Sequence, residues 1–344
     1  MKFDYAIGNP PYQEQIQDTS DKPVYNYFIN ASHQIADVSE LITPSRFLFN
    51  VGKTPKDWNK QMLNDEHFRV LHYEQTSKDV FPNTDIKGGV VITEYNNSIK
   101  REPIEVFTTL PELNEIRKKV WSSANCVSLN TIMNTAYKFK LDALYADHPE
   151  YKSVIGSNGN EKRLISNVFA LLDCFRNTKE SNDDILIHGL INNVRINKWI
   201  DKKYIDLNHS TYGRYKVILP ASNGSGAIGE VIPTPLVGEP LVGEPLVGFT
   251  QTFISVGWFD TKDEADACLK YVKTKFARTA LGVKKTTQSS TPDKWQYVPI
   301  QDFTPNSDID WSKSVADIDK QLYKKYGLSD EEIVFIEEKV KEMT

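Results

Sequence analysis

The chain has 344 residues, a length at which one hydrophobic core is rare, so we expect more than one domain. Hydrophobic residues make up 40% and charged residues 25%, no apolar run is long enough to span a bilayer, and the first residues do not open a signal peptide, so we expect a cytoplasmic globular protein. The net charge of −5 argues mildly against a nucleic-acid partner, although an acidic protein can carry one basic face.

Short apolar runs alternate with amphipathic stretches over the first hundred residues. We predict strands at residues 3–8, 40–44, 69–73 and 88–95, and helices at residues 25–35 and 58–68. The first helix places Tyr27, Phe28, Ala31 and Ile35 on one side. Strands alternating with helices predict an α/β domain over residues 1–110, with a largely parallel sheet covered on both faces.

The composition changes near residue 110, where Asn, Ser and Lys become frequent. Strands are predicted at residues 217–220 and 253–257 and a helix at residues 263–281, which indicates a mixed α+β domain over residues 111–305. A helical tail follows over residues 306–344. It contains a helix at residues 315–326, and a capping box formed by Ser329 and Glu332 opens the last helix.

Two loop segments are predicted in the second half. Residues 238–242 are repeated as residues 243–247, and the proline in each copy disfavours a helix or a central strand. The glycine-rich residues 222–229 follow a strand but precede no convincing helix, so we interpret them as a loop and not a nucleotide cradle.

No metal site is indicated. Cys126, Cys174 and Cys268 form no CxxC pair, and the six histidines are scattered. One basic cluster is a candidate for phosphate contacts, with a solvated helix face as the alternative; it contains Lys273, Lys275, Arg278, Lys284 and Lys285.

The tetrapeptide Asn9-Pro10-Pro11-Tyr12 follows the first strand, at the end of an α/β strand where ligands bind. The Asn9 side-chain oxygen and the Pro10 carbonyl can accept both hydrogens of an exocyclic amine and so localise its lone pair. The two prolines stiffen the turn and present no competing N–H. The Tyr12 ring can stack on a base swung out of a duplex. The alternative is a proline-stiffened turn without chemistry.

Residues 3–12 closely resemble the catalytic motif of gamma-class N6-adenine DNA methyltransferases of restriction-modification systems. Residues 25–28 and 41–48 resemble the helix and strand that follow, and Val80-Phe81-Pro82 resembles the segment whose phenylalanine packs against the flipped adenine. Residues 253–288 and 298–326 resemble the later recognition region. The resemblance implies double-stranded DNA as partner, S-adenosylmethionine as methyl donor, catalytic residues Asn9, Pro10, Pro11 and Tyr12, and base contacts by Tyr12 and Phe81.

The family places a glycine turn for S-adenosylmethionine well before the Asn-Pro-Pro-Tyr motif, which here starts at residue 9. We therefore expect a partial Rossmann-like methyltransferase sheet, an incomplete cofactor site and an edge strand at residues 3–7. We expect an upstream-encoded methyltransferase half, or self-association, at this edge strand. The alternatives are a non-catalytic DNA-binding specificity subunit and an inactive truncated methyltransferase.

Overall fold

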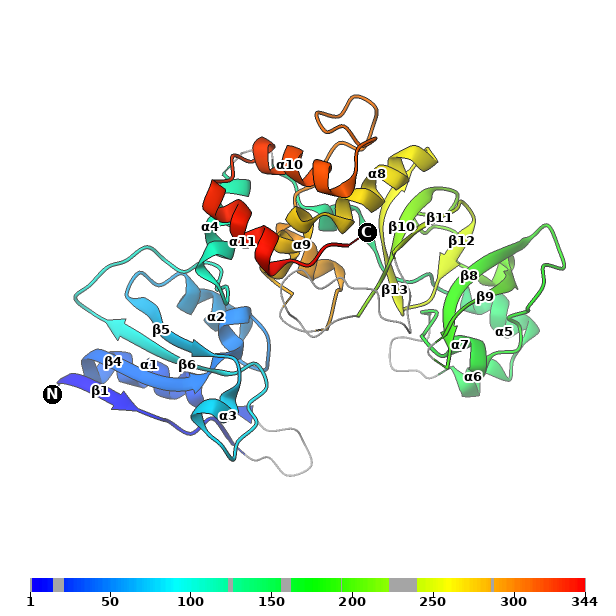
Figure 1. The fold of residues 1–344 in the computed structure, drawn as a ribbon. Coiled ribbons are helices and arrows are strands. Elements are labelled where there is room, and N and C mark those ends of the chain that lie inside the picture. Colours follow the sequence, from blue (N-terminus) through cyan, green and yellow to red (C-terminus); the bar gives the residue numbers. More distant parts are fainter. Residues whose placement is uncertain are drawn as a thin grey trace. The chain divides into compact units, whose positions relative to one another are not determined.

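The computed structural model describes residues 2–14, 22–122, 126–155, 162–192, 194–222, 240–285 and 288–343. The glycine-rich residues 223–229 and the start of the predicted repeat lie outside these ranges. The chain divides into two compact units, Met1–Asn114 and Glu115–Thr344 (Figure 1). No helix in the described ranges has the length and apolar character needed to cross a membrane.

The first unit is built on a mixed four-stranded sheet in the order β1-β4-β6-β5. Its strands are β1 (Phe3–Gly8), β4 (Ala36–Pro44), β6 (Val90–Asn96) and β5 (Phe68–Glu74). β1 runs parallel to β4, whereas β6 is antiparallel to both β4 and β5. The prediction of a largely parallel sheet was therefore wrong, because the chain leaves β5 through the short helix α3 (Ser77–Val80) and re-enters the sheet from the same end.

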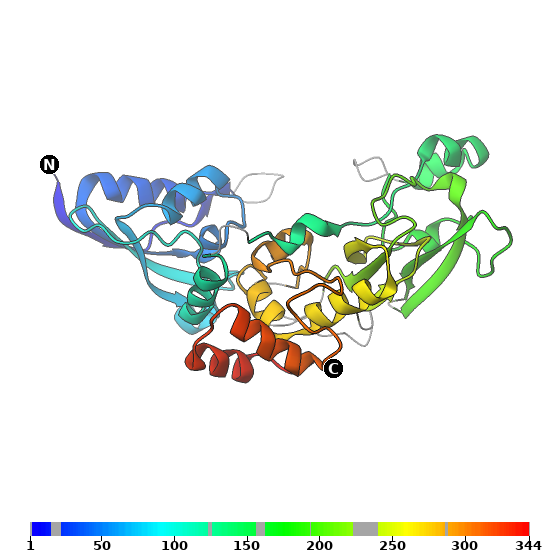
Figure 2. The ribbon, with the colours of Figure 1, turned by 90° about the horizontal axis from the view of Figure 1, so that it is seen from above.

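Helix α1 (Tyr25–Ile35), the 3-10 helix η1 (Ser45–Phe49) and helix α2 (Lys56–Leu63) pack on one face of this sheet (Figure 2). Their shared core includes Ile29, Phe47 and Met62. The opposite face carries Glu94, which is paired with Arg69 and Arg101. Coverage of both faces was thus predicted wrongly, since α1 and α2 share one side.

Helix α1 buries a different side from the one predicted. Its buried residues are Tyr25, Asn26, Ile29 and Ser32, whereas the predicted apolar side is exposed to solvent: Tyr27, Phe28, Ala31 and Ile35. The spacing identified the helix correctly, but α1 has apolar side chains on two sides and only one of them meets the sheet. An apolar stripe remains uncovered.

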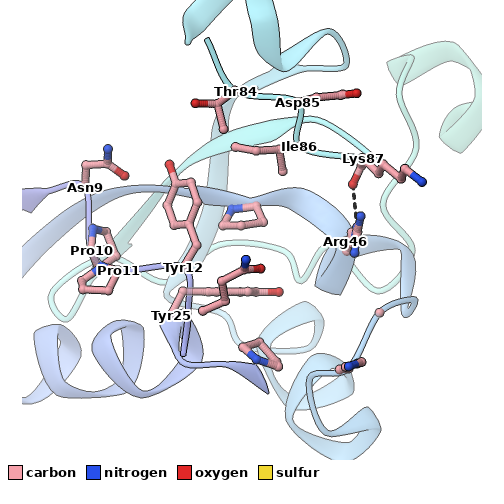
Figure 3. Close-up of a pocket in the computed structure, with 15 residues that line it drawn as sticks. Asn9, Pro10, Pro11, Tyr12, Tyr25, Arg46, Thr84, Asp85, Ile86 and Lys87 are labelled. Carbon is pink, nitrogen blue, oxygen red and sulfur yellow. Dashed lines mark hydrogen bonds between the residues drawn. The ribbon is translucent and has the colours of Figure 1, made fainter. Parts of the chain in front are cut away.

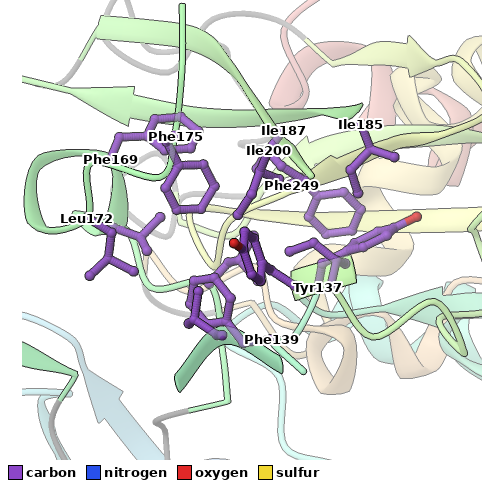
Figure 4. Close-up of a cluster of buried hydrophobic side chains, with 14 of the residues drawn as sticks. Tyr137, Phe139, Phe169, Leu172, Phe175, Ile185, Ile187, Ile200 and Phe249 are labelled. Carbon is purple, nitrogen blue, oxygen red and sulfur yellow. The ribbon is translucent and has the colours of Figure 1, made fainter. Parts of the chain in front are cut away.

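The second unit contains two further sheets. One has the order β11-β10-β13-β7 and the other β12-β8-β9. The strands are β7 (Met133–Asn134), β8 (Asp184–Ile191), β9 (Val194–Asp201), β10 (Tyr215–Pro220), β11 (Leu241–Gly243), β12 (Val247–Phe249) and β13 (Phe253–Phe259). Figure 4 shows the core under the smaller sheet, where Tyr137 and Phe249 pack beside Ile187.

The second unit also contains helices, and the first of them, α4, begins in the first unit. Most are short: α4 (Pro111–Val120), α5 (Leu141–Asp147), α6 (Tyr151–Val154) and α7 (Val168–Leu171), with 3-10 helices η2 (Leu129–Ile132), η3 (Lys202–Tyr204) and η4 (Pro292–Tyr297). The helix predicted at residues 263–281 is in fact two, α8 (Lys262–Lys273) and α9 (Lys275–Gly282). Thr274 separates them, because its hydroxyl accepts the Ala277 N–H and caps α9.

The C-terminal helices α10 (Val315–Lys325) and α11 (Asp330–Lys339) match the predicted positions, and the Ser329–Glu332 capping box is confirmed. The loop prediction for the repeat was wrong in part, since residues 241–243 form the edge strand β11. Pro240 and Pro245 lie outside that strand, so the prolines bound it without removing a ladder hydrogen bond. In the first unit, the described residues also form the short antiparallel strands β2 (Gln13–Glu14) and β3 (Lys22–Pro23).

Candidate functional site

The Asn9-Pro10-Pro11-Tyr12 segment lines a pocket of about 670 Å³ in the first unit (Figure 3). It follows the last residue of β1, and Pro44, the last residue of the parallel strand β4, lines the same pocket. The pocket therefore lies at the carboxyl ends of two parallel strands, where α/β sheets bind ligands. Its volume falls in the usual range for small-molecule sites.

Two features fix the turn that carries the motif. Beyond Tyr12 the chain forms the β2–β3 hairpin, and the Tyr12 carbonyl accepts the Val24 N–H at 3.1 Å. The Tyr12 hydroxyl is buried without a hydrogen-bond partner among the described residues, and burial raises its pKa. Tyr12 therefore stays a neutral phenol whose ring lines the pocket, while Asn9 is exposed to solvent and to an incoming ligand.

The opposite wall comes from the segment between α3 and β6, residues 84–87, together with η1. Backbone and side-chain bonds hold these two segments together. The Ser45 N–H donates to the Gly89 carbonyl at 3.1 Å, and the Ser45 hydroxyl donates to the Gly88 carbonyl at 2.5 Å. The Tyr73 hydroxyl donates to that same Gly88 carbonyl at 3.2 Å. The wall is thus anchored to the ends of β4 and β5.

The structure places all four residues of the predicted motif at this pocket, but it does not place Phe81 in the described lining. Phe81 ends α3, is half-buried, and its carbonyl accepts the Thr84 N–H at 2.9 Å. Its backbone therefore holds Thr84, a residue of the wall, in place. The role of Phe81 as a base contact stays a prediction.

The predicted basic cluster does not form one exposed face. Arg278 and Lys285 are buried, with 1% and 2% of their surface exposed, so the prediction of phosphate contacts is wrong for these two residues. Arg278 binds carbonyls inside the fold, because it lies on the buried side of α9. The Lys275 ammonium pairs with Glu337, and that of Lys284 donates to the Gln296 side chain at 2.6 Å.

The sequence analysis did not assign Tyr25, Arg46 and Lys53, which also line the pocket. Burial raises the pKa of Tyr25 to about 12, while the nearby charge of Arg46 acts in the opposite direction. The sequence signal that could have identified Arg46 was its position, because it follows Pro44 at the carboxyl end of a strand parallel to β1.

Among its described lining residues, the pocket lacks one feature that S-adenosylmethionine sites usually have. Nucleotide cofactors are typically cradled by a glycine turn that leads from a strand into a helix. Within the described part of the first unit, the turn after β1 carries two prolines instead, and no such glycine turn lines the pocket. The described lining therefore does not by itself fit the cofactor.

Part of the chain is similar in sequence to known methylases. Residues 1–81 match the Eco57I restriction-modification methylase family. An uncharacterized adenine-specific methylase of Mycoplasma pneumoniae is 26% identical over 103 residues, which are 28% of this chain and 24% of that protein. The matched part thus spans about a quarter of that relative. The crystal structure of the type IIG restriction endonuclease BpuSI aligns with a TM-score of 0.32 and 10% identity, over 93% of this chain and 48% of BpuSI.

Proposed function

We propose that this chain is the base-acting and DNA-recognition part of a site-specific adenine-N6 DNA methyltransferase of a restriction-modification system, working in the cytoplasm. The single observation that carries the proposal is the Asn9-Pro10-Pro11-Tyr12 pocket at the carboxyl ends of β1 and β4. That pocket lies mostly within the residues that match the methylase family.

The chemistry assigned to this chain is orientation of the adenine amine. The Asn9 side-chain oxygen and the Pro10 carbonyl accept its two hydrogens, which localises the nitrogen lone pair for attack. The Tyr12 ring stacks on the flipped base, and Phe81 supports it from the wall after a small rearrangement. S-adenosylmethionine supplies an electrophilic methyl group, and its binding residues are not assigned to this chain. Transfer would break the sulfonium S–C bond as the N–C bond forms, and the amine proton would then leave for solvent.

The second unit would provide DNA recognition. Lys273, Lys275 and Lys284 remain the proposed phosphate contacts of the basic cluster, because they are half-buried and retain some solvent access. Double-stranded DNA is the proposed partner. If these lysines contact phosphates, affinity should fall steeply with salt, by about 0.9 in log-log slope for each contact.

A protein partner is also proposed, at the edge strand β1. Among the described residues β1 pairs along one edge only, with β4, and the side chains of Phe3, Tyr5 and Ile7 on this strand are exposed; Ile7 is 76% exposed. The uncovered side of α1 adds Phe28 and Ile35. An upstream-encoded methyltransferase half would cover these residues by adding a strand to β1. Sedimentation of the chain with and without the proposed partner half would test this. The expected result is a complex with that half, and the other outcome is self-association through the same edge.

The function is tested by methyl transfer from labelled S-adenosylmethionine to DNA, with and without the proposed partner half. Asn9→Ala should abolish transfer and leave DNA affinity nearly unchanged, because the Asn9 oxygen orients the amine and contacts no phosphate. Asn306→Ala, at an exposed position in the second unit, is the matched control and should transfer at the wild-type rate. Equal losses of affinity and rate in Asn9→Ala would overturn the assignment. DNA binding without any methyl transfer would favour a specificity subunit or a truncated enzyme.

A further inference from the structure

Two turns that contain glycine pack closely against the side chain of Arg46. Gly52 has φ +85° and Gly88 has φ +92°, conformations that favour glycine. A Cβ on Gly52 would lie 3.3 Å from the Arg46 Cβ, and one on Gly88 would lie 3.2 Å from the Arg46 Cγ. The backbone of two separate loops therefore approaches the arginine stem closely. This arrangement fixes where the guanidinium can reach.

The guanidinium is anchored at one nitrogen only. The Arg46 Nε donates to the Lys87 carbonyl at 2.5 Å (Figure 3). In the part of the chain that the structure describes, no carboxylate forms an ion pair with Arg46, and its two terminal nitrogens donate no hydrogen bond. Arginine in a half-buried position is usually paired, because its charge is costly to remove from water. The terminal nitrogens are therefore available to an anionic ligand in the pocket.

The charges around the pocket reinforce this anion preference. Lys53 and Lys87 line the pocket together with Arg46, and Asp85 is the one acidic residue of the described lining. In the view of Figure 3, Arg46 and Lys87 lie on one side of Tyr12 and Asn9 lies on the other. The pocket thus has a cationic end and an end that accepts amine hydrogens.

We propose that the Arg46 guanidinium binds a phosphate group of the nucleotide whose adenine is held by Asn9 and Pro10. This inference rests on the proposed function and extends it from the base to the backbone of the flipped nucleotide. An adenine nucleotide has an amino group at one end and an anion at the other, which matches the two ends of the pocket. A guanidinium presents parallel N–H donors that suit two phosphate oxygens, and hydrogen bonds of this charged kind are the stronger ones. Arg46 is therefore a binding residue that holds the extruded nucleotide in place.

The test is a titration of the full chain with deoxyadenosine and with deoxyadenosine monophosphate, monitored by protein and phosphorus NMR. The monophosphate is used in two forms, with the phosphate on the 5′ or on the 3′ hydroxyl. The wild type should bind one of the two monophosphates about tenfold more tightly than the nucleoside, the size expected for a charged hydrogen-bond pair. Which monophosphate is preferred identifies the phosphate of the DNA strand that Arg46 contacts. Raised salt should reduce the preference.

Variants separate this inference from the proposed function. Arg46→Gln should bind nucleoside and nucleotide equally, whereas Asn9→Ala should weaken both ligands and keep the preference for phosphate. Arg46→Lys retains the charge, so it should keep part of the preference and the fold even if Arg46→Gln is destabilised by losing the bond to the Lys87 carbonyl. A wild type that does not distinguish nucleotide from nucleoside, or an unchanged preference in a folded Arg46→Gln, would overturn the inference. A preference that depends on Arg46 without any methyl transfer in the complemented enzyme would instead sink the proposed function.

Discussion

Replacing Arg278 should cost stability and leave DNA binding almost unchanged. Arg278 is 1% exposed, although its sequence context is that of a basic surface cluster. Its Nε donates to the carbonyls of Lys273 and Thr274 at 3.0 and 3.2 Å, and its terminal nitrogen donates to the Lys341 carbonyl at 2.7 Å. These bonds join the end of α8 to the C-terminal segment.

The expected loss of stability follows from the carbonyl acceptors that lose their donor. In Arg278→Met the apolar stem is largely kept, and the Thr274 carbonyl still accepts the backbone N–H of residue 278. The carbonyls of Lys273 and Lys341 lose a charged donor. A buried acceptor left unsatisfied costs about 1–3 kcal/mol, and these two bonds are partly buried, so about 1.5 kcal/mol for each carbonyl and a loss of about 3 kcal/mol are expected. For a unit of this size, that is a decrease in Tm of about 9 °C.

The assay is thermal and urea unfolding of the full chain followed by tryptophan fluorescence. Five of the six tryptophans lie in residues 115–344, so the signal reports mainly on the second unit. Lys284→Met is the matched control, because the Lys284 ammonium is described with one hydrogen bond, to the Gln296 side chain. This variant should lower the free energy of unfolding by less than about 1 kcal/mol. An Arg278→Met protein with an unchanged midpoint and weakened binding to duplex DNA would refute the reasoning.

Three further predictions concern protonation and backbone conformation. Burial lowers the pKa of His33 to about 4, so the unfolded state binds more protons than the folded state between about pH 6.5 and 4. Urea titrations should therefore show the free energy of unfolding falling by up to about 3 kcal/mol as the pH drops through this window. In His33→Gln this dependence on pH should be lost. Burial lowers the pKa of Lys216 to about 7, so the free energy of unfolding should rise from about pH 7 to 9 in the wild type and less in Lys216→Met; a flat wild-type profile contradicts this. Gly89→Ala would put a Cβ 2.2 Å from the Glu74 carbonyl oxygen at φ +84°, so it should lose more than about 2 kcal/mol by urea unfolding, whereas Gly213→Ala, at φ +75° with open space around it, should lose about 1 kcal/mol. Equal losses in the two glycine variants would show that the close contact is relieved at little cost.

Local structure was more predictable from the sequence than the pairing of surfaces. The strand at residues 3–8 and the Ser329–Glu332 capping box depend on neighbouring residues, and both are found where predicted. The direction of β6 depends on where the chain re-enters the sheet, and no local pattern encodes that. The two sides of α1 show the same limit, since Ile29 and Phe28 are equally apolar in sequence but only Ile29 is buried.

The charged residues reveal a second limit, which concerns function directly. Lysine and arginine are mostly exposed in proteins, so a cluster of them in sequence favours a surface role. Arg278 departs from this rule because carbonyls at the end of α8 and at Lys341 satisfy its donors, and those carbonyls come together only in the folded chain. Spacing along the sequence therefore could not show that Arg278 is buried and cannot make the predicted phosphate contact.

The pocket combines both situations. The end proposed to accept the adenine amine is one contiguous tetrapeptide, so the sequence alone was sufficient to propose Asn9 and Pro10 for that role. Its cationic end requires η1 and residues 84–87, which are about forty residues apart and are joined by the bond from the Arg46 Nε to the Lys87 carbonyl. A motif search therefore finds the atoms that would meet the adenine amine and misses the group that would meet the phosphate. If Arg46 holds the nucleotide, the catalytic motif alone binds a base weakly, and the loop that Ser45 and Arg46 anchor turns it into a nucleotide site.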